Sequence, residues 1–328
     1  MTLHPSTALF EGEKPLPSLA ACEHFAGSRK LIDKALALQA AIGPVFDLTC
    51  DCEDGAAAGE ESAHVRMVAQ CIASGANLHG MVGARVHDPS TRFWRDEIDV
   101  LVGAAGDRIA YVTLPKCTSV GDVATMIEHL RSRETAAGLA RRIPVHVLVE
   151  THGALRDAHR IAALPGVQTL DFGLMDFVSA HQGAIGFEAM RSPGQFEHPL
   201  IVRAKTETVA AALAHGVIPS HNVSLTLRDP EATRADAHRA RHEFGFLRMW
   251  SVHPDQIRPI VEAMRPSASE AELAGEILLA ARAAQWGPVR HRDMLHDRAT
   301  YRYFWSVLQA AQRGGLPLRA EVRAAFFE

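Results

Sequence analysis

The 328-residue chain lacks the long apolar and basic segments that mark membrane-spanning and nucleic-acid-binding proteins. It has no run of about 18 or more apolar residues, so we expect no membrane-spanning helix. The formal net charge is -4, and no basic run or basic-aromatic patch occurs, which argues against a nucleic-acid partner. The first residues show no basic stretch followed by an apolar core, so we expect no secretory signal peptide.

Cysteine is also scarce, and its pattern argues against both disulfides and a structural zinc site. The five cysteines are Cys22, Cys50, Cys52, Cys71 and Cys117, an odd number without the spacing of a disulfide framework. We therefore expect reduced thiols and a cytoplasmic protein. Cys50 and Cys52 lie too close together for a zinc-binding pair, and no second pair follows them.

Hydrophobic residues make up 47% of the chain and occur in short runs that alternate with helical patterns. The apolar runs predict eight strands, at residues 22–26, 44–50, 81–86, 109–114, 144–149, 167–172, 216–223 and 249–252. Helical patterns follow at residues 29–39, 60–74, 93–102, 120–135, 154–164, 201–215, 233–244 and 256–264. Such β-α repetition over about 260 residues predicts an α/β fold, a (β/α)8 TIM barrel, spanning residues 1–266. A doubly wound sheet is the alternative, but no Gly-x-Gly-x-x-Gly motif follows the first strand.

Two segments lie outside the repeated units. Residues 179–199 contain several glycines and prolines and are too long for a tight turn, so we expect a lid or binding loop. Helical patterns at residues 270–285 and 300–312 predict a C-terminal helical extension over residues 267–328. This extension exceeds what a barrel needs, and we expect it to pack on a neighbouring subunit.

Two of the predicted strands lead to a carboxylate. Glu150 follows the fifth strand, and Asp176 lies shortly after the sixth. Because a helix separates the two strands, they should be parallel neighbours whose carboxyl ends meet at one rim. Burying an acid without a countercharge is costly, and a hard divalent cation such as Mg²⁺ would offset the cost. The pair therefore predicts a metal site.

Other charged residues follow further strands, where TIM barrels place their catalytic groups. Glu53 and Asp54 follow the second strand, although Asp54 could also begin an ordinary turn or helix. Arg85 lies in an apolar run, and a buried charge in a parallel strand needs a partner. Lys116 follows the fourth strand, where a site residue and a solvated loop lysine are equal alternatives. His253 follows the eighth strand and is the histidine that we rank first.

In their order along the chain, these motifs resemble the HpcH/HpaI aldolase and citrate lyase beta-subunit superfamily, in particular its CitE-like CoA-ester lyases. The matching motifs are Asp51-Cys52-Glu53-Asp54, Arg85-Val86-His87, Pro115-Lys116, Glu150-Thr151-His152-Gly153, Phe172-Gly173-Leu174-Met175-Asp176 and Val252-His253-Pro254-Asp255-Gln256. The resemblance covers most of the chain, from about Ser28 to the C-terminal helix. The ordered set is specific, whereas any single motif would be weak.

The resemblance implies roles for individual residues. The metal ligands of the family correspond to Glu150 and Asp176, which would bind Mg²⁺ or, in its place, Mn²⁺. Its catalytic residues correspond to Arg85, Glu53, Asp54 and Asp297, and its substrate-binding residues to Arg85, Lys116, Gly173 and His253. Asp297 would enter the active site of a neighbouring subunit, with an N-cap of the final helix as an equal alternative.

The resemblance also implies a reaction and an assembly. We expect a carbon–carbon lyase that cleaves or forms a 3-hydroxyacyl-CoA ester of the citryl-, malyl- or methylmalyl-CoA type, with acetyl- or propionyl-CoA and a 2-oxo acid as products. The expected assembly is a homotrimer or homohexamer. One alternative is a CoA-independent, Mg²⁺-dependent aldolase acting on a free hydroxy-oxo acid. Another is a non-catalytic or complex-dependent subunit of a citrate lyase assembly, which would meet an acyl-carrier thioester.

Three positions depart from the family pattern. His87 replaces an asparagine, Leu247-Arg248 replaces a Gly-Lys pair, and residues 219–222 replace a run that contains aspartate. These departures concern thioester recognition and substrate identity, and they leave the predicted metal pair unchanged.

Overall fold

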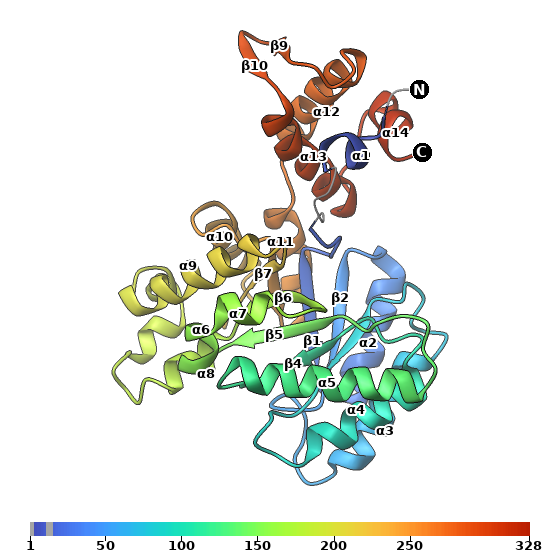
Figure 1. Ribbon diagram of the computed structural model, residues 1–328. Helices are drawn as coiled ribbons and strands as arrows, with labels where there is room; N and C mark the ends of the chain where they lie inside the picture. The colour runs from blue at the N-terminus through green and yellow to red at the C-terminus, as the bar shows by residue number, and fades with distance from the viewer. Residues whose placement is uncertain (1–2, 11–15) are drawn as a thin grey trace. The chain divides into compact units, whose positions relative to one another are not determined.

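The computed structural model describes residues 3–10 and 16–328, and its larger unit is a closed barrel of parallel strands with helices outside it (Figure 1). The strands are β1 (Cys22–Ala26), β2 (Phe46–Asp51), β3 (Val82–Arg85), β4 (Val112–Leu114), β5 (Val145–Val149), β6 (Val167–Phe172), β7 (Ile218–His221) and β8 (Arg248–Ser251). Each strand pairs with the next in the sequence, and β8 closes the barrel by pairing with β1. The predicted (β/α)8 fold is therefore confirmed.

The helices of this unit follow the strands in the predicted order. They are α2 (Arg29–Ile42), α3 (Glu61–Ala73), α4 (Phe93–Ala105), α5 (Val120–Ala136), α6 (His152–Arg156), α7 (Ala158–Ala162), α8 (Leu174–Ser179), α9 (Pro199–Ala214), α10 (Pro230–His242) and α11 (Pro254–Met264). Ser28, Ser119 and Asp229 accept backbone N–H groups at the starts of α2, α5 and α10, which stabilises these helix ends. The single helix predicted at residues 154–164 is instead divided at Asp157 into α6 and α7.

The loop that follows α8 is packed against the barrel wall. It contains the short 3-10 helices η1 (Phe187–Met190) and η2 (Gly194–Phe196). Gln195 lies buried and accepts hydrogen bonds from Lys205 Nζ at 3.2 Å and Asn222 Nδ2 at 2.9 Å. Its own amide donates to Asp236 Oδ2 at 3.2 Å. These contacts connect the loop to α9, to α10 and to the end of β7.

The interior of the barrel is polar, whereas the main apolar core lies between the strands and the helices. Arg248 on β8 is fully buried and forms ion pairs with Glu23 at 3.1 Å and Asp47 at 2.6 Å. The ring of Tyr111 also fills the interior, and a Cβ at Gly83 would lie 2.4 Å from that ring. A glycine at this position therefore makes room for the aromatic ring.

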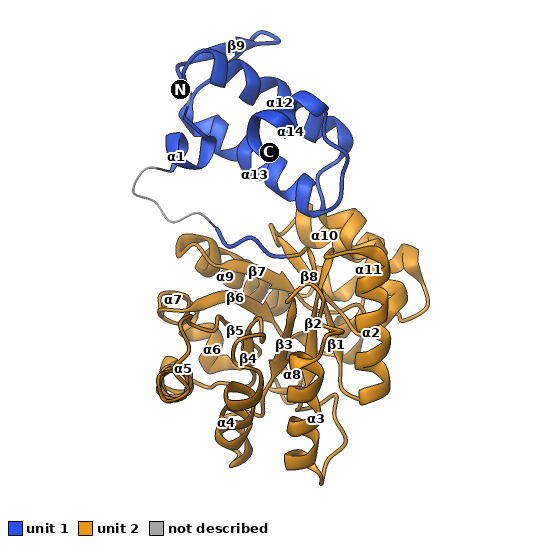
Figure 2. Cartoon of the chain, turned by 90° about the vertical axis from the view of Figure 1, so that its right-hand side faces the viewer, with its two compact units in different colours: residues 1–19, 265–328 blue, residues 20–264 orange. Residues whose placement is uncertain are grey.

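A second compact unit is built from both ends of the chain, from the described residues up to Leu19 and from Arg265–Glu328 (Figure 2). Its elements are α1 (Pro5–Leu9), α12 (Ala268–Ala283), β9 (Val289–His291), β10 (Met294–His296), α13 (Arg298–Arg313) and α14 (Ala320–Phe326). Leu9 is fully buried in the apolar core of this unit together with Leu308. Because of this packing the N-terminal helix groups with the C-terminal helices, whereas the predicted boundary assigned residues 1–266 to the barrel.

Two expectations from composition can be compared with the structure. The five cysteines are buried free thiols. In the described part of the chain, every helix is too short or too polar to cross a membrane.

Candidate active site

Four of the charged residues predicted for the site, Asp54, Arg85, Glu150 and Asp176, line a cavity of about 260 Å³ at the carboxyl ends of the barrel strands. Asp51, Glu53, Asp54, Arg85, Lys116, Glu150 and Asp176 form what we call the charged arc, which follows β2 to β6. Phe25, Val223, Trp250 and Val252 form what we call the apolar arc, which belongs to β1, β7 and β8 and the residues that follow them. Leu174 and Met175 beside Asp176, and Asn222 beside Val223, complete the lining, so the charges of the cavity are concentrated on one side without filling it.

Arg85 is the best-paired residue of the charged arc. Its Nε and Nη2 atoms donate to the two carboxylate oxygens of Asp51 at 2.8 and 2.6 Å, and its Nη1 lies 3.0 Å from Glu53 Oε2. Burial alone would lower the pKa of Arg85, but the two carboxylates outweigh it and raise that pKa. Burial likewise favours a higher pKa for Asp51, yet Arg85 holds the pKa of that carboxyl below its usual value. The guanidinium is thus a fixed positive charge at the cavity wall.

Lys116 connects the two ends of the charged arc. Its Nζ donates to Glu53 Oε1 at 2.5 Å and to Asp54 Oδ2 at 2.7 Å, and it lies 3.7 Å from Asp176 Oδ1. Burial alone would lower the pKa of Lys116, but the hydrogen-bonded acids raise it. The backbone at Lys116 has a φ of 49°, and its N–H donates to Glu150 Oε1 at 2.7 Å. Lys116 was predicted to be either a site residue or a solvated loop lysine. Its hydrogen bonds to Glu53 and Asp54 place its side chain among the acids of the site.

Glu150 and Asp176 line the same cavity and are close enough to interact electrostatically. Glu150 is only 1% exposed, and burial together with the negative charge of Asp176 raises the pKa of Glu150 to about 8. Arg85 opposes this shift without cancelling it. The cost of ionising Glu150 is thus high in the protein alone.

Gly173 lies directly against one of these acids. A Cβ at Gly173 would come within 2.2 Å of Glu150 Oε2, so any other residue would displace the carboxylate. We predicted that Gly173 binds substrate, and its observed contact is with the side chain of Glu150. Gly55 has a comparable place, because a Cβ there would lie 2.3 Å from Asp51 Oδ2.

The donor set at the end of β5 and the start of α8 fits a hard divalent cation. Glu150 and Asp176 offer carboxylate oxygens, the ligand type that Mg²⁺ prefers. Burial and, second to it, the charge of Asp176 raise the pKa of Glu150, and a bound cation would offset both costs of ionising it.

A second group of possible metal ligands lies deeper in the barrel. Ligand atoms of Glu23, His146 and Asp171 all lie within 4.8 Å of one another, and the three side chains are buried. Burial and the charge of Glu23 raise the pKa of Asp171 to about 7. Arg248 already pairs with Glu23 and opposes this shift, so we interpret the group as part of the polar barrel interior. Sequence reasoning did not anticipate it, because the three residues lie within buried strands and not at the strand ends where site residues are expected.

The family model for HpcH/HpaI aldolase/citrate lyase matches residues 31–254, a range that contains the whole charged arc. The chain belongs to the HpcH/HpaI aldolase/citrate lyase family. A citrate lyase of Burkholderia xenovorans LB400 with a known crystal structure is 52% identical, with a TM-score of 0.86, and the match covers 99% of this chain and 100% of that one. The predictions of this family and of a carbon–carbon lyase are confirmed.

Two further relatives belong to the same comparison. The L-malyl-CoA/beta-methylmalyl-CoA lyase of Rhodobacter capsulatus is 26% identical over 321 residues, which cover 92% of this chain and 98% of that protein. CitE of Mycobacterium tuberculosis, solved with magnesium, acetoacetate and coenzyme A, is 22% identical with a TM-score of 0.67. That match covers 91% of this chain and 99% of the other, and it shows a shared fold.

The apolar arc is the part of this family site that sequence reasoning missed. The rings of Phe25 and Trp250 lie 4.7 Å apart and form one apolar cluster with the fully buried Leu148, and Val223 packs against this cluster. Arg85 bridges the two arcs, because its Cζ lies 5.4 Å from the centre of the Phe25 ring. The sequence alone does not distinguish these apolar residues from ordinary strand core. Their place at the cavity becomes evident only when β8 pairs with β1 and closes the barrel.

Four predicted residues are absent from the cavity lining: Glu53 and Lys116, which pair with residues of the charged arc, and His253 and Asp297. His253 follows β8, but its Nδ1 accepts a hydrogen bond from the Asp255 backbone at 3.3 Å. Asp297 belongs to the second unit and caps α13, where its carboxylate accepts from the Ala299 backbone at 3.0 Å and Thr300 completes a capping box. The N-cap alternative for Asp297 is therefore observed, and its role in a neighbouring active site stays a prediction.

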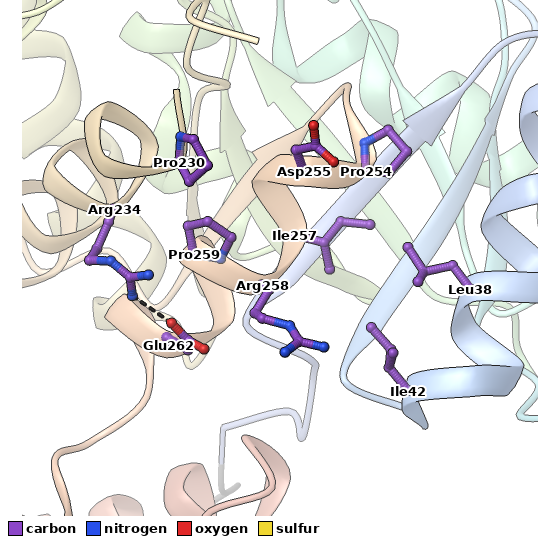
Figure 3. Close-up of a pocket in the computed structure, with 10 residues that line it drawn as sticks. All are labelled: Leu38, Ile42, Pro230, Arg234, Pro254, Asp255, Ile257, Arg258, Pro259 and Glu262. Carbon is purple, nitrogen blue, oxygen red and sulfur yellow. Dashed lines mark hydrogen bonds and ion pairs between the residues drawn. The ribbon is translucent and has the colours of Figure 1, made fainter. Parts of the chain in front are cut away.

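The rim cavity is identified by its chemistry and not by its size. A larger hollow of about 370 Å³ lies among α2, α10 and α11 (Figure 3). It is lined by apolar residues such as Leu38 and Ile257 and by an Arg234–Glu262 ion pair of 2.6 Å, which Figure 3 shows as a dashed line. None of the residues that we predicted for the family site lines this hollow.

Proposed function

We propose that the protein is a Mg²⁺-dependent lyase that cleaves, or in reverse forms, a 3-hydroxyacyl-CoA ester. The products of cleavage are acetyl- or propionyl-CoA and a 2-oxo acid. The observation that carries this proposal is the adjacency of Glu150 and Asp176 beside the fixed guanidinium of Arg85 in one cavity. The malyl-CoA lyase relative and the magnesium-bound, CoA-bound relative support the same chemistry.

Glu150 and Asp176 would hold the cation, with Mn²⁺ as a substitute of similar geometry. When bound, the ion supplies Lewis-acid polarisation of the substrate's hydroxyl or carbonyl oxygen. Gly173 keeps the Glu150 carboxylate free to turn toward the cavity, because no side chain competes for its space.

The side chains of the charged arc orient the substrate. Arg85 can bind the substrate carboxylate or stabilise charge on the oxygen that becomes the carbonyl. Its guanidinium is held in position by two hydrogen bonds to Asp51. Lys116 adds a second positive charge. It pairs with Oε1 of Glu53, whereas Arg85 pairs with Oε2 of the same carboxylate. Burial raises the pKa of Glu53 despite both cations, so this carboxyl group is suited to orienting water or exchanging a proton.

Cleavage breaks the bond between the second and third carbons of the acyl group. The hydroxyl gives its proton to a carboxylate of the charged arc, for which Glu53 is our candidate, as the carbonyl of the 2-oxo acid forms. The bonding electrons pass to the thioester enolate, which takes a proton at carbon. Asp297 of a neighbouring subunit is our candidate for the acid that donates this last proton, because a carboxylic acid can protonate the enolate carbon.

An assembly of identical subunits would bring Asp297 to the site, and we propose a homotrimer or homohexamer. In the second unit, Met294 and Leu295 precede this aspartate and are 58% and 71% exposed, which suits contact with another copy. Asp297→Asn is an informative variant because asparagine caps helices as well as aspartate does. It should keep the fold and the assembly mass measured by light scattering while activity falls, and a monomer in solution would contradict the proposal.

The metal assignment is tested by substituting its two ligands. Glu150→Gln and Asp176→Asn should each lower Mg²⁺-dependent cleavage of malyl-type CoA esters by roughly a hundredfold or more. Calorimetry should show weakened Mg²⁺ binding in both variants. Asp255→Asn is the matched control, because this exposed acid lies at the same rim outside the cavity lining, and it should change activity less than twofold, roughly. Full activity in either ligand variant would contradict the assignment.

Calorimetry with acetyl-CoA separates this proposal from its alternatives. Binding of acetyl-CoA supports a CoA-ester lyase. Cleavage of a free hydroxy-oxo acid without acetyl-CoA binding would instead indicate a CoA-independent aldolase, and acceptance of a carrier-protein thioester alone would indicate a subunit of a citrate lyase assembly.

A further inference from the structure

We propose that the apolar arc selects a 2-oxo acid with one carboxylate and a short apolar substituent over one with a second carboxylate. This inference rests on the proposed function and deepens it, because it names the class of carbonyl compound on one side of the broken bond. The substituent would lie against Phe25 and Trp250 while the carboxylate faces the charged arc.

The first observation is the charge of the cavity. Four carboxylates and one guanidinium line it among the described residues, and the guanidinium of Arg85 is already paired with Asp51 and Glu53. Lys116 is similarly compensated by Glu53 and Asp54. A divalent cation would offset only part of this negative charge. One substrate carboxylate can share the cation and Arg85, but a second one would find no further cation among the residues that line the cavity.

The second observation is the wall opposite the acids. Phe25 and Trp250 are each 8% exposed, their rings lie 4.7 Å apart, and the fully buried Leu148 belongs to the same apolar cluster. Val223 and Val252 extend this wall along the cavity. An alkyl substituent that loses water against such a wall gains about fourfold in affinity for each buried methylene group. A carboxylate in the same place would lose its hydration without a countercharge.

The third observation is the pair of buried polar atoms on this side of the cavity. The indole Nε1 of Trp250 and Oδ1 of Asn222 have no hydrogen-bond partner, although both residues line the cavity. Asn222 is held in place, since its Nδ2 donates to Gln195 Oε1 at 2.9 Å and to the Val223 carbonyl at 2.9 Å. One neutral donor and one neutral acceptor suit an uncharged carbonyl or hydroxyl group. Neither atom can neutralise a carboxylate, which agrees with the charge argument.

The test compares the affinities of small 2-oxo acids for the full-length protein saturated with Mg²⁺, measured by calorimetry. The probes are pyruvate, 2-oxobutyrate and oxaloacetate, which differ in the group beside the ketone. We expect 2-oxobutyrate to bind about fourfold more tightly than pyruvate and at least about tenfold more tightly than oxaloacetate. Oxaloacetate binding as tightly as 2-oxobutyrate would overturn the inference.

A second test adds a positive charge to the apolar arc instead of removing one of its buried side chains, so its result does not depend on lost packing. Val252 is 45% exposed and lines the cavity, so a longer side chain can be accommodated there. Val252→Lys should improve oxaloacetate binding about tenfold relative to pyruvate, because it supplies the missing countercharge. Val252→Met, which adds length without charge, should leave that ratio within about twofold of the unmodified protein. An unchanged ratio in Val252→Lys would also overturn the inference.

These measurements separate the inference from the proposed function. If the 2-oxo acids bind only in the presence of Mg²⁺ but oxaloacetate is preferred, the inference fails and the lyase proposal stands. If none of them binds with Mg²⁺ present, the proposed function fails, and the inference that depends on it fails too.

Discussion

The two arcs of the barrel rim hold their side chains in place by different physical means. In the charged arc, Arg85 and Lys116 are fixed by ion pairs, and each shares Glu53 with the other. In the apolar arc, Phe25 and Trp250 are fixed by packing on Leu148. A change in the first arc leaves a charge without its partner, whereas a change in the second leaves empty space. Substitutions in the charged arc should therefore lower catalysis and stability together, whereas substitutions in the apolar arc should change stability and substrate preference more than the rate of the chemical step.

Arg85→Met should have the largest effect, because methionine keeps much of the side-chain volume but none of the charge. It leaves Asp51 and Glu53 buried without their shared partner, which should lower the free energy of unfolding by about 3–5 kcal/mol. Loss of the electrostatic group should also lower kcat/KM by roughly a hundredfold to a thousandfold. Urea denaturation and steady-state kinetics measure the two effects.

Arg29→Met is the matched control for this variant. Arg29 forms an exposed pair with Asp33, with more than half of each side chain in solvent. Its replacement should change stability by less than about 1 kcal/mol and leave kcat/KM unchanged. Equal losses of stability in both variants would contradict the prediction that the buried ion pairs of Arg85 stabilise the fold more than an exposed pair does.

Leu148→Ala tests the support of the apolar arc. It removes a fully buried side chain beneath Phe25 and Trp250, which should lower the free energy of unfolding by roughly 3–4 kcal/mol. The ion pairs of the charged arc are untouched, so kcat/KM should fall by less than about tenfold. Leu31→Ala is the control, because Leu31 is 47% exposed and its truncation should cost less than about 1 kcal/mol. If kcat/KM of Leu148→Ala fell as far as that of Arg85→Met, the arcs would not act separately.

The contrast between the arcs also explains what the sequence could predict. Glu150 follows one predicted strand directly and Asp176 comes shortly after the next, so the order of the strands alone brings the two acids to one rim. Arg85 stood out for the same reason, as a charge inside an apolar run. Phe25 and Trp250 gave no comparable signal, because an aromatic residue in a strand is ordinary core. Their role depends on the closure of β8 onto β1, which joins segments far apart in the sequence.

The barrel interior shows a second limit of sequence reasoning. Arg248 appeared in the sequence only as a departure from the family's Gly-Lys pair, yet it is fully buried and compensates Glu23 and Asp47. Its partners lie more than 200 positions earlier on β1 and β2, so no local pattern connects them. The N-terminal helix was likewise assigned to the barrel, because the packing of Leu9 with C-terminal helices is not a local property.

The smallest of the three effects concerns His24, which lies beside Phe25 on β1 and is hydrogen-bonded to Ser251 Oγ at 2.8 Å. Burial, with a smaller contribution from the charge of His253, lowers the pKa of His24 to about 4 from an ordinary 6.5. In the unfolded chain His24 is therefore protonated below about pH 6.5, whereas in the folded protein it is protonated only below about pH 4. Stability that is present above pH 6.5 is lost as the pH falls through this window.

His24→Asn should remove this part of the pH dependence, because asparagine has no group that titrates in the window. Between pH 7.5 and pH 5, the unmodified protein should lose about 2 kcal/mol more unfolding free energy than the variant does. The measurement is a series of urea denaturation curves at several pH values, compared by slope so that any constant cost of the substitution cancels. His79→Asn, at an exposed histidine, should leave the slope unchanged. Parallel curves for His24→Asn and the unmodified protein would mean that β1, beside the apolar arc, is open enough to water for its histidine to be protonated as freely as in the unfolded chain.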